Sequence, residues 1–131
     1  MGLPISSTDL PKDSYDLVLD GVIGYSLQGN PRGRAGELIT WANQQSAPIL
    51  ALDAPSGIDT TSGTVFEPAI KAVATMTLAL PKEGLRQASV GQHVGELYLA
   101  DISVPPELYG NKQLGLTVGN IFSENDIIRL K

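Results

Sequence analysis

Four apolar runs with the length and composition of buried β-strands alternate with polar, glycine-rich segments along the chain. They lie at residues 15–20, 48–53, 74–80 and 96–102. Because the runs are nearly continuous in apolar character, we expect their strands to be buried on both faces.

The segment between the first two runs has the periodicity of an amphipathic helix. Its apolar residues recur at positions i, i+3, i+4 and i+7, and we expect the helix to end near Gln45. These residues are Ala35, Leu38, Ile39 and Ala42. A strand, a helix and a second strand form a βαβ unit, in which the strands are parallel and the crossover is right-handed. The pattern therefore predicts an α/β domain with a mainly parallel sheet.

The remaining segments are predicted to connect these elements. Residues 1–14 are polar and interrupted by proline, which indicates a lead-in loop. We expect a short helical turn at 68–73 and a loop with one helical turn at 81–95. Residues 107–131 are predicted to form a C-terminal tail that contains one short element at 125–130.

Composition and charge narrow the kinds of function. The chain has 131 residues, of which 42% are hydrophobic and 18% charged, as is typical of one folded domain. Its net charge of −5 leaves no basic stripe for nucleic acid. The absence of cysteine excludes disulfides, thiolate nucleophiles and zinc–thiolate sites. No apolar stretch approaches the ~18 residues of a membrane span, and the N-terminus has no secretory pattern. We therefore expect a cytoplasmic protein, or an organellar one after removal of a transit peptide, with neither nucleic acid nor membrane as partner.

Two polar loops follow the first two predicted strands. Asp20 precedes a glycine-rich loop at 21–33, and Asp53 precedes a second loop at 54–64. Open parallel sheets bind ligands outside the carboxyl ends of their strands, so the two loops predict a binding site. The alternative is that each aspartate only caps neighbouring backbone amides, as strand-end aspartates often do.

The motifs in these loops resemble those of one known family. The first loop reads Asp20-Gly-Val-Ile-Gly-Tyr-Ser-Leu-Gln-Gly-Asn30 and is followed by Arg32-Gly33. It is similar to the D-A-x-x-G-x-G-x-x-G-x-x-R-G segment of the NAD(P)H-hydrate epimerases, the YjeF N-terminal domain family. The second loop, Asp53-Ala-Pro-Ser-Gly-Ile-Asp59, resembles the D-x-P-S-G-x-D element of that family.

Two further motifs, later in the chain, support the resemblance. Pro81-Lys82-Glu83-Gly84-Leu85 is similar to the family's K-x-G-L turn after a strand, and residues 95–105 resemble its G-x-x-x-x-x-D-I-x-x-P strand. The resemblance implies a Rossmann-like three-layer sandwich with a mainly parallel sheet. It leaves open whether Lys82 orients the loops or lies on the surface.

The resemblance also implies roles for individual residues. Asp53 would be the catalytic acid/base, and Asp20 and Ser56 would be ligands of a bound potassium ion, whereas Asp59 is expected to shape its own turn. The implied substrate-binding residues are Gly24, Tyr25, Ser26, Leu27, Gln28, Gly29, Asn30 and Asp53. Glycines in such a loop allow backbone N–H groups to approach a phosphate closely.

One part of the family pattern has no counterpart here. Family members begin with a strand, a helix and an N-G-G-D-G-type loop, and all three are absent from these 131 residues. By resemblance, that loop contacts the substrate phosphate and supplies an asparagine ligand to the potassium ion. Residues 1–131 are therefore predicted to be a partial domain, which forms a homo-oligomer or is completed by an N-terminal chain.

The expected activity is that of an isomerase acting on a small molecule. The resemblance implies epimerisation of the R and S forms of hydrated NADH or NADPH, a repair of damaged nicotinamide cofactors. One alternative is a non-catalytic ligand-binding or oligomerisation module of the same fold. Another is an unrelated α/β nucleotide-binding domain.

Overall fold

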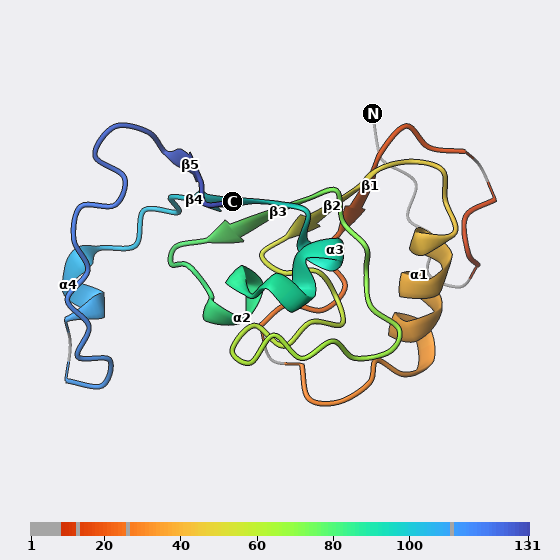
Figure 1. The fold of residues 1–131 in the computed structure, drawn as a ribbon, viewed down its shortest axis with the longest axis horizontal. Coiled ribbons are helices and arrows are strands. Elements are labelled where there is room, and N and C mark those ends of the chain that lie inside the picture. The colour runs from red at the N-terminus through yellow and green to blue at the C-terminus, as the bar shows by residue number, and fades with distance from the viewer. Residues whose placement is uncertain (1–8, 13, 26, 111) are drawn as a thin grey trace.

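A mainly parallel sheet organises the protein (Figure 1). The computed structural model describes residues 9–12, 14–25, 27–110 and 112–131. In this part of the chain five strands pair in the order β1-β2-β3-β4-β5. They are β1 (Val18–Asp20), β2 (Ile49–Leu52), β3 (Ala74–Leu78), β4 (Glu96–Ala100) and β5 (Ile127–Arg129). The first four are parallel and β5 is antiparallel to β4, which confirms the predicted Rossmann-like α/β fold.

The helices are short except for the first. They are α1 (Gly33–Asn43), α2 (Glu83–Arg86), η1 (Ala88–Val90), α3 (Gly91–Val94) and α4 (Pro106–Tyr109). Helix α1 connects β1 to β2, as the apolar spacing predicted, and it buries Ile39 and Ala42. Within the described residues, no helix combines the length and apolar character needed to cross a membrane.

The helical turn predicted at 68–73 does not form. This segment has bends at Pro68 and Val73 and no regular structure between them, and its amides bond to distant parts of the chain. Ile70 N–H donates to the Ser56 carbonyl, Ala72 N–H to the His93 carbonyl and Val73 N–H to the Ile49 carbonyl. Such long-range bonds satisfy the backbone without a local turn.

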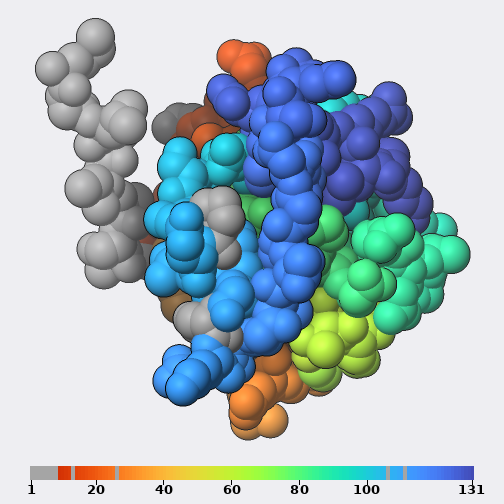
Figure 2. All heavy atoms as spheres, turned by 90° about the vertical axis from the view of Figure 1, so that its left-hand side faces the viewer, coloured from red at the N-terminus to blue at the C-terminus, as the bar shows by residue number. Residues whose placement is uncertain are grey.

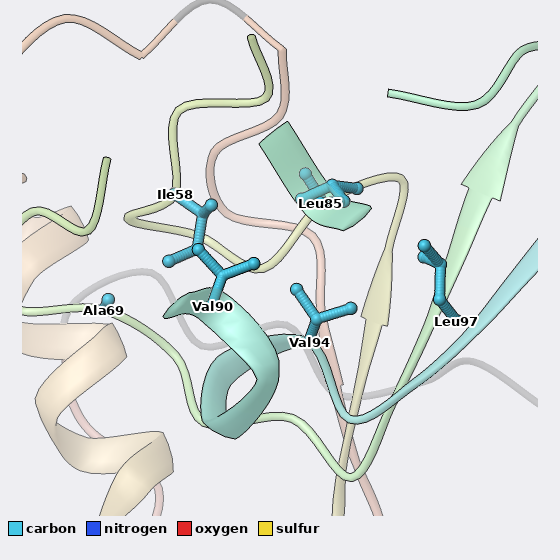
Figure 3. Packing of buried hydrophobic residues seen from close by; sticks show 7 residues of the cluster. Ile58, Ala69, Leu85, Val90, Val94 and Leu97 are labelled. Carbon is cyan, nitrogen blue, oxygen red and sulfur yellow. The ribbon is translucent and has the colours of Figure 1, made fainter. Parts of the chain in front are cut away.

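The sheet is packed on one face by the helical layer. In Figure 1, α1, α2 and α3 lie on the same side of the strands. Side chains on that face form two buried clusters, one of them around Leu85, Val90, Val94 and Leu97 (Figure 3). The other joins α1 to β2 through Ile39 and Ile49.

The expectation that the strands are buried on both faces is wrong for the described residues. Burial alternates along β2, and Leu52 is 54% exposed. Leu19 of β1 is 72% exposed. Because the described helices lie on one face, side chains that point to the opposite face have no layer over them.

The C-terminal tail lies at the end of the molecule where β3 and β4 terminate (Figure 1), and its residues cover much of that side (Figure 2). It contributes α4 and then β5, which corresponds to the short element predicted at 125–130. Between the tail and the strand ends is a cavity of about 480 Å³. Ala79 and Asp101, which directly follow β3 and β4, line it together with tail residues. The predicted lead-in loop at 1–14 lies mostly outside the described residues.

The packing predicts a large effect of one core truncation. Leu85 is fully buried, so Leu85→Ala should lower the free energy of unfolding by about 2–5 kcal/mol through lost contacts and a residual cavity. Urea denaturation followed by circular dichroism measures this change. The control is Leu108→Ala at a 52%-exposed position, where we expect a change within about 0.5 kcal/mol. Equal effects of the two substitutions would contradict the described core.

Candidate active site

The carboxylate of Asp20 is buried where β1 ends, with 3% of the residue exposed. Its Oδ2 accepts a hydrogen bond from the Ser56 N–H at 2.7 Å, and its Oδ1 accepts one from the Ser56 Oγ at 2.7 Å. Val22 N–H donates to Oδ1 at 3.3 Å. A buried carboxylate is tolerated only with such donors, and those to a charged oxygen are the stronger kind. Asp20 therefore has the capping role expected of a strand-end aspartate, and through it joins the two loops.

Ser56 is the point where the loops meet. Its Oγ accepts a hydrogen bond from Ile23 N–H at 2.8 Å and lies 3.2 Å from the Ile23 carbonyl oxygen. The hydroxyl has one proton, and the shorter contact assigns it to Asp20 Oδ1. Ser56 also accepts from Ile70 N–H through its carbonyl oxygen at 2.8 Å. A single fully buried serine thus fixes the backbone of both loops.

Asp53 leaves the sheet in an unusual backbone conformation. It directly follows β2 and has φ of +68°, a left-handed value that is uncommon outside glycine. Its N–H still donates to the Met76 carbonyl of β3 at 2.8 Å. Its side chain reaches the end of β3, where Leu78 N–H donates to it. The Ser56 amide is bonded to Asp20, so Asp53 does not cap it.

The two oxygens of the Asp53 carboxylate have different surroundings. Lys82 Nζ donates to Oδ1 at 2.6 Å, and Leu78 N–H donates to the same oxygen at 3.3 Å. Oδ2 faces the first loop, since a methyl group placed on Gly24 would lie 3.9 Å from it. The Asp53 and Lys82 side chains are 24% and 17% exposed, which makes this a half-buried ion pair.

The first residue of the predicted substrate loop lies beside Asp53, and the rest of the loop extends into solvent. Tyr25 is 71% exposed. Gly29 has φ of +80°, and Asn30 Oδ1 accepts a hydrogen bond from Glu67 N–H at 3.2 Å. Leu27 is partly buried and Gln28 is exposed. Ser26 lies outside the described residues.

The contact of Lys82 with Asp53 is the feature that sequence reasoning missed. The family motif placed Lys82 after the third strand and left open whether it orients the loops or lies on the surface. Both residues come just after neighbouring parallel strands, and β2 pairs with β3 along their length. Parallel neighbours end at the same edge of a sheet, and this rule would have placed the two side chains together.

Asp20 and Ser56 present the donor types that a hard cation prefers. The Asp20 carboxylate, the Ser56 Oγ and the Ile23 carbonyl converge within hydrogen-bonding distance of the serine hydroxyl. All are oxygens, the ligand type of hard cations. Among the described residues, no group of three or more Asp, Glu or His side chains is arranged to hold a metal ion. The donor chemistry therefore fits potassium, with most ligands other than Asp20 being neutral oxygens.

Polar groups gathered at the carboxyl ends of parallel strands define an α/β domain of the ligand-binding kind. The family model described as YjeF-related protein N-terminus matches residues 1–84. The chain therefore belongs to the YjeF N-terminal family. A solved structure of yeast ynu0 has the same fold, with a TM-score of 0.67, 20% identity, and coverage of 88% of this chain and 46% of that one.

Curated relatives give closer sequence matches. An NAD(P)H-hydrate epimerase of Dehalogenimonas lykanthroporepellens is 46% identical over 94 residues, covering 72% of this chain and 37% of that protein. One of Truepera radiovictrix is 40% identical over 102 residues, covering 78% of this chain and 45% of that protein. A bifunctional NAD(P)H-hydrate repair enzyme of Salinibacter ruber is 37% identical over 90 residues. The chain spans less than half the length of these relatives.

Asp59, within the second loop, shapes its own turn, as expected. Its Oδ1 accepts hydrogen bonds from Ser62 N–H at 2.6 Å and Thr61 N–H at 2.9 Å. The pKa of Asp59 lies below its ordinary value of 3.8. The causes, largest first, are hydrogen bonds from the backbone N–H of Ser62, from the Ser62 side chain and from the Thr61 N–H. The charged form of Asp59 is therefore favoured in the folded protein.

This shift predicts a pH-dependent effect of Asp59→Asn. A lowered folded-state pKa contributes stability that is present above pH 3.8 and is lost as the pH falls through the folded value. The parent should therefore be more stable than the variant at pH 7, and the difference should shrink below pH 3.8. Urea denaturation across this range measures it, with Asp126→Asn as the control for general charge effects. A difference that stays constant with pH would contradict the assignment.

Proposed function

We propose that this chain carries the acid/base part of a site that interconverts the R and S forms of hydrated NADH or NADPH. The observation that carries the proposal is the Asp53 carboxylate, whose Oδ2 faces the glycine-containing loop at Gly24. Relatives named NAD(P)H-hydrate epimerase support this substrate class. Asp53 is the one carboxylate described at this edge that is both partly exposed, at 24% of its side chain, and next to the predicted substrate loop.

The reaction requires a group that gives and takes a proton. The substrate has a hydroxyl on the ring carbon next to the ring nitrogen. Either the hydroxyl leaves as water and returns to the opposite face, or the ring opens at that carbon and closes again. In the first route Asp53 takes up a proton at Oδ2 from solvent, gives it to the departing hydroxyl, and later takes one from the attacking water. Its negative charge also stabilises the ring cation between the two steps.

The loop at 24–30 would bind the remainder of the substrate. Gly24 and Gly29 bring backbone close to a ligand without a side chain between them, and Tyr25 presents an exposed ring on which a base or ribose can pack. Helix α1 begins three residues after Asn30, and its N-terminal amides favour a phosphate nearby. This arrangement supports nicotinamide nucleotide as the ligand class.

A potassium ion would be held by Asp20 and Ser56, with the Ile23 carbonyl as a further oxygen. When bound, the ion supplies a fixed positive charge beside the loop that carries the substrate phosphates. Without the ion, direct hydrogen bonds between Asp20 and Ser56 keep the two loops together.

The complete site is proposed to include residues from outside this sequence. The relatives are more than twice as long as the matched segment, and the bifunctional relative matches over 17% of its own length. A complementing N-terminal chain or a homo-oligomer would supply the missing contacts in the cytoplasm. The alternative is a non-catalytic ligand-binding or oligomerisation module of the same fold.

The epimerisation assay tests the proposal. The R form of hydrated NADH should convert to the S form faster with the protein than in a buffer blank, which measures the uncatalysed reaction. Asp53→Asn should lower the rate by about 10²–10⁴-fold, the usual contribution of a general acid/base, with an unchanged circular dichroism spectrum. Asp16→Asn, at the opposite end of β1, is the matched control.

The assay also separates the two versions of the site. Acceleration that appears only after an N-terminal family segment is added supports a site shared between chains. If epimerisation is not accelerated with or without the segment, the chain only binds its ligand, and the proposal of an enzyme is rejected. Undiminished activity of Asp53→Asn would remove that residue from the acid/base role.

Potassium binding makes a separate prediction. Crystals grown with thallium(I) in place of potassium should show anomalous density beside Asp20 and Ser56, and Asp20→Asn should remove it, because a carboxylate is the strongest ligand in this group. The protein should also gain thermal stability from potassium but not from the same concentration of lithium. If crystals of the parent and of Asp20→Asn both show only the density expected of water at this position, the ion site is rejected.

A further inference from the structure

The Asp53 carboxylate is held asymmetrically, and this asymmetry carries an inference that rests on the proposed function. Both hydrogen bonds described for the carboxylate end on Oδ1, one from Lys82 Nζ at 2.6 Å and one from Leu78 N–H at 3.3 Å. Oδ2 points toward Gly24 on the substrate loop. One oxygen is therefore anchored to β3 and its connection, and the other is turned to the place where a ligand would lie.

Lys82 is itself fixed on both sides. Its Nζ donates a second hydrogen bond to the Leu78 carbonyl at 2.9 Å, so the ammonium lies between β3 and Asp53. Its backbone is the N-cap residue of α2, and the fully buried Leu85 of α2 anchors that helix in the core. The Gly84 N–H donates to the Thr60 carbonyl at 2.9 Å, which ties α2 to the second loop. The ammonium thus reaches Asp53 from a rigid support.

Asp53 needs such a support because its backbone does not supply one. The left-handed φ of +68° places it in a sparsely populated region, and a residue there persists when its surroundings hold it. The ion pair with Lys82 is only 17–24% exposed, so it is less weakened by solvent than a surface pair. Without Lys82, the Asp53 carboxylate would keep only the long hydrogen bond from the Leu78 amide.

We propose that Lys82 is the positioning residue of the active site: by holding Oδ1 of Asp53, it makes Oδ2 the oxygen that exchanges the proton with the substrate. Lys82 acts through Asp53 and does not itself touch the reacting carbon. Without the ammonium, the carboxylate rotates about its side-chain bonds, and the fraction of time in the reactive orientation falls. A loss of orientation lowers kcat and leaves the affinity for the substrate nearly unchanged.

Lys82→Met tests the proposal because it keeps the length of the side chain and removes the ammonium. The first measurement is hydrogen exchange of the Leu78 amide by NMR, which does not depend on activity. Exchange should be about tenfold faster in the variant because the carboxylate no longer stays over this amide. The second is the steady-state rate of epimerisation, where kcat should fall about tenfold or more and KM should change less than about threefold. Lys71→Met, at an exposed lysine, is the matched control and should change neither quantity.

Each outcome decides a different claim. Unchanged Leu78 exchange in folded Lys82→Met overturns the anchoring of Asp53, whatever the activity. Faster exchange with unchanged kcat overturns the role in the reaction, and a raised KM with unchanged kcat assigns Lys82 to substrate binding instead. No epimerisation by the parent protein rejects the proposed function, and the exchange result still decides whether Lys82 orients Asp53. If Lys82→Met does not fold, Lys82→Gln removes the charge with a polar side chain and is judged by the same two measurements.

Discussion

Asp20 ends β1 with a carboxylate that has almost no access to water, and a charge in such a place must be matched by hydrogen-bond donors. Ser56 supplies two of them, from its amide and its hydroxyl, although it lies 36 residues further along the chain. The same hydroxyl accepts from Ile23. Both loops of the site therefore depend on this one pair, and the position of Asp53 relative to Gly24 follows from it.

The sequence was sufficient to predict the parts of the fold that local pattern determines. Apolar runs located β1 to β4, and the helical spacing located α1 with its buried Ile39 and Ala42. The aspartates at the ends of β1 and β2 were placed at one sheet edge because parallel strands bring their carboxyl ends together. These inferences need only the periodicity of each element and a rule about topology.

Other features depend on contacts that no local pattern contains. Residues 68–73 resemble a helical turn in isolation, but three long-range backbone hydrogen bonds hold them in an irregular conformation. Burial of β2 on both faces was inferred from its apolar run, whereas Leu52 is half-exposed because the described helices lie on the other face. The bond from Lys82 to Asp53 required the registration of β3 against β2, which the motifs alone did not give.

The left-handed backbone of Asp53 also limits how this family can be stabilised. Glycine adopts that conformation without strain, so a glycine at this position would be the simplest way to relax the turn. It would also delete the carboxylate proposed to do the chemistry. Selection for a more stable fold and selection for proton transfer thus favour different residues at one position. In this chain the aspartate keeps its carboxylate at the cost of backbone strain.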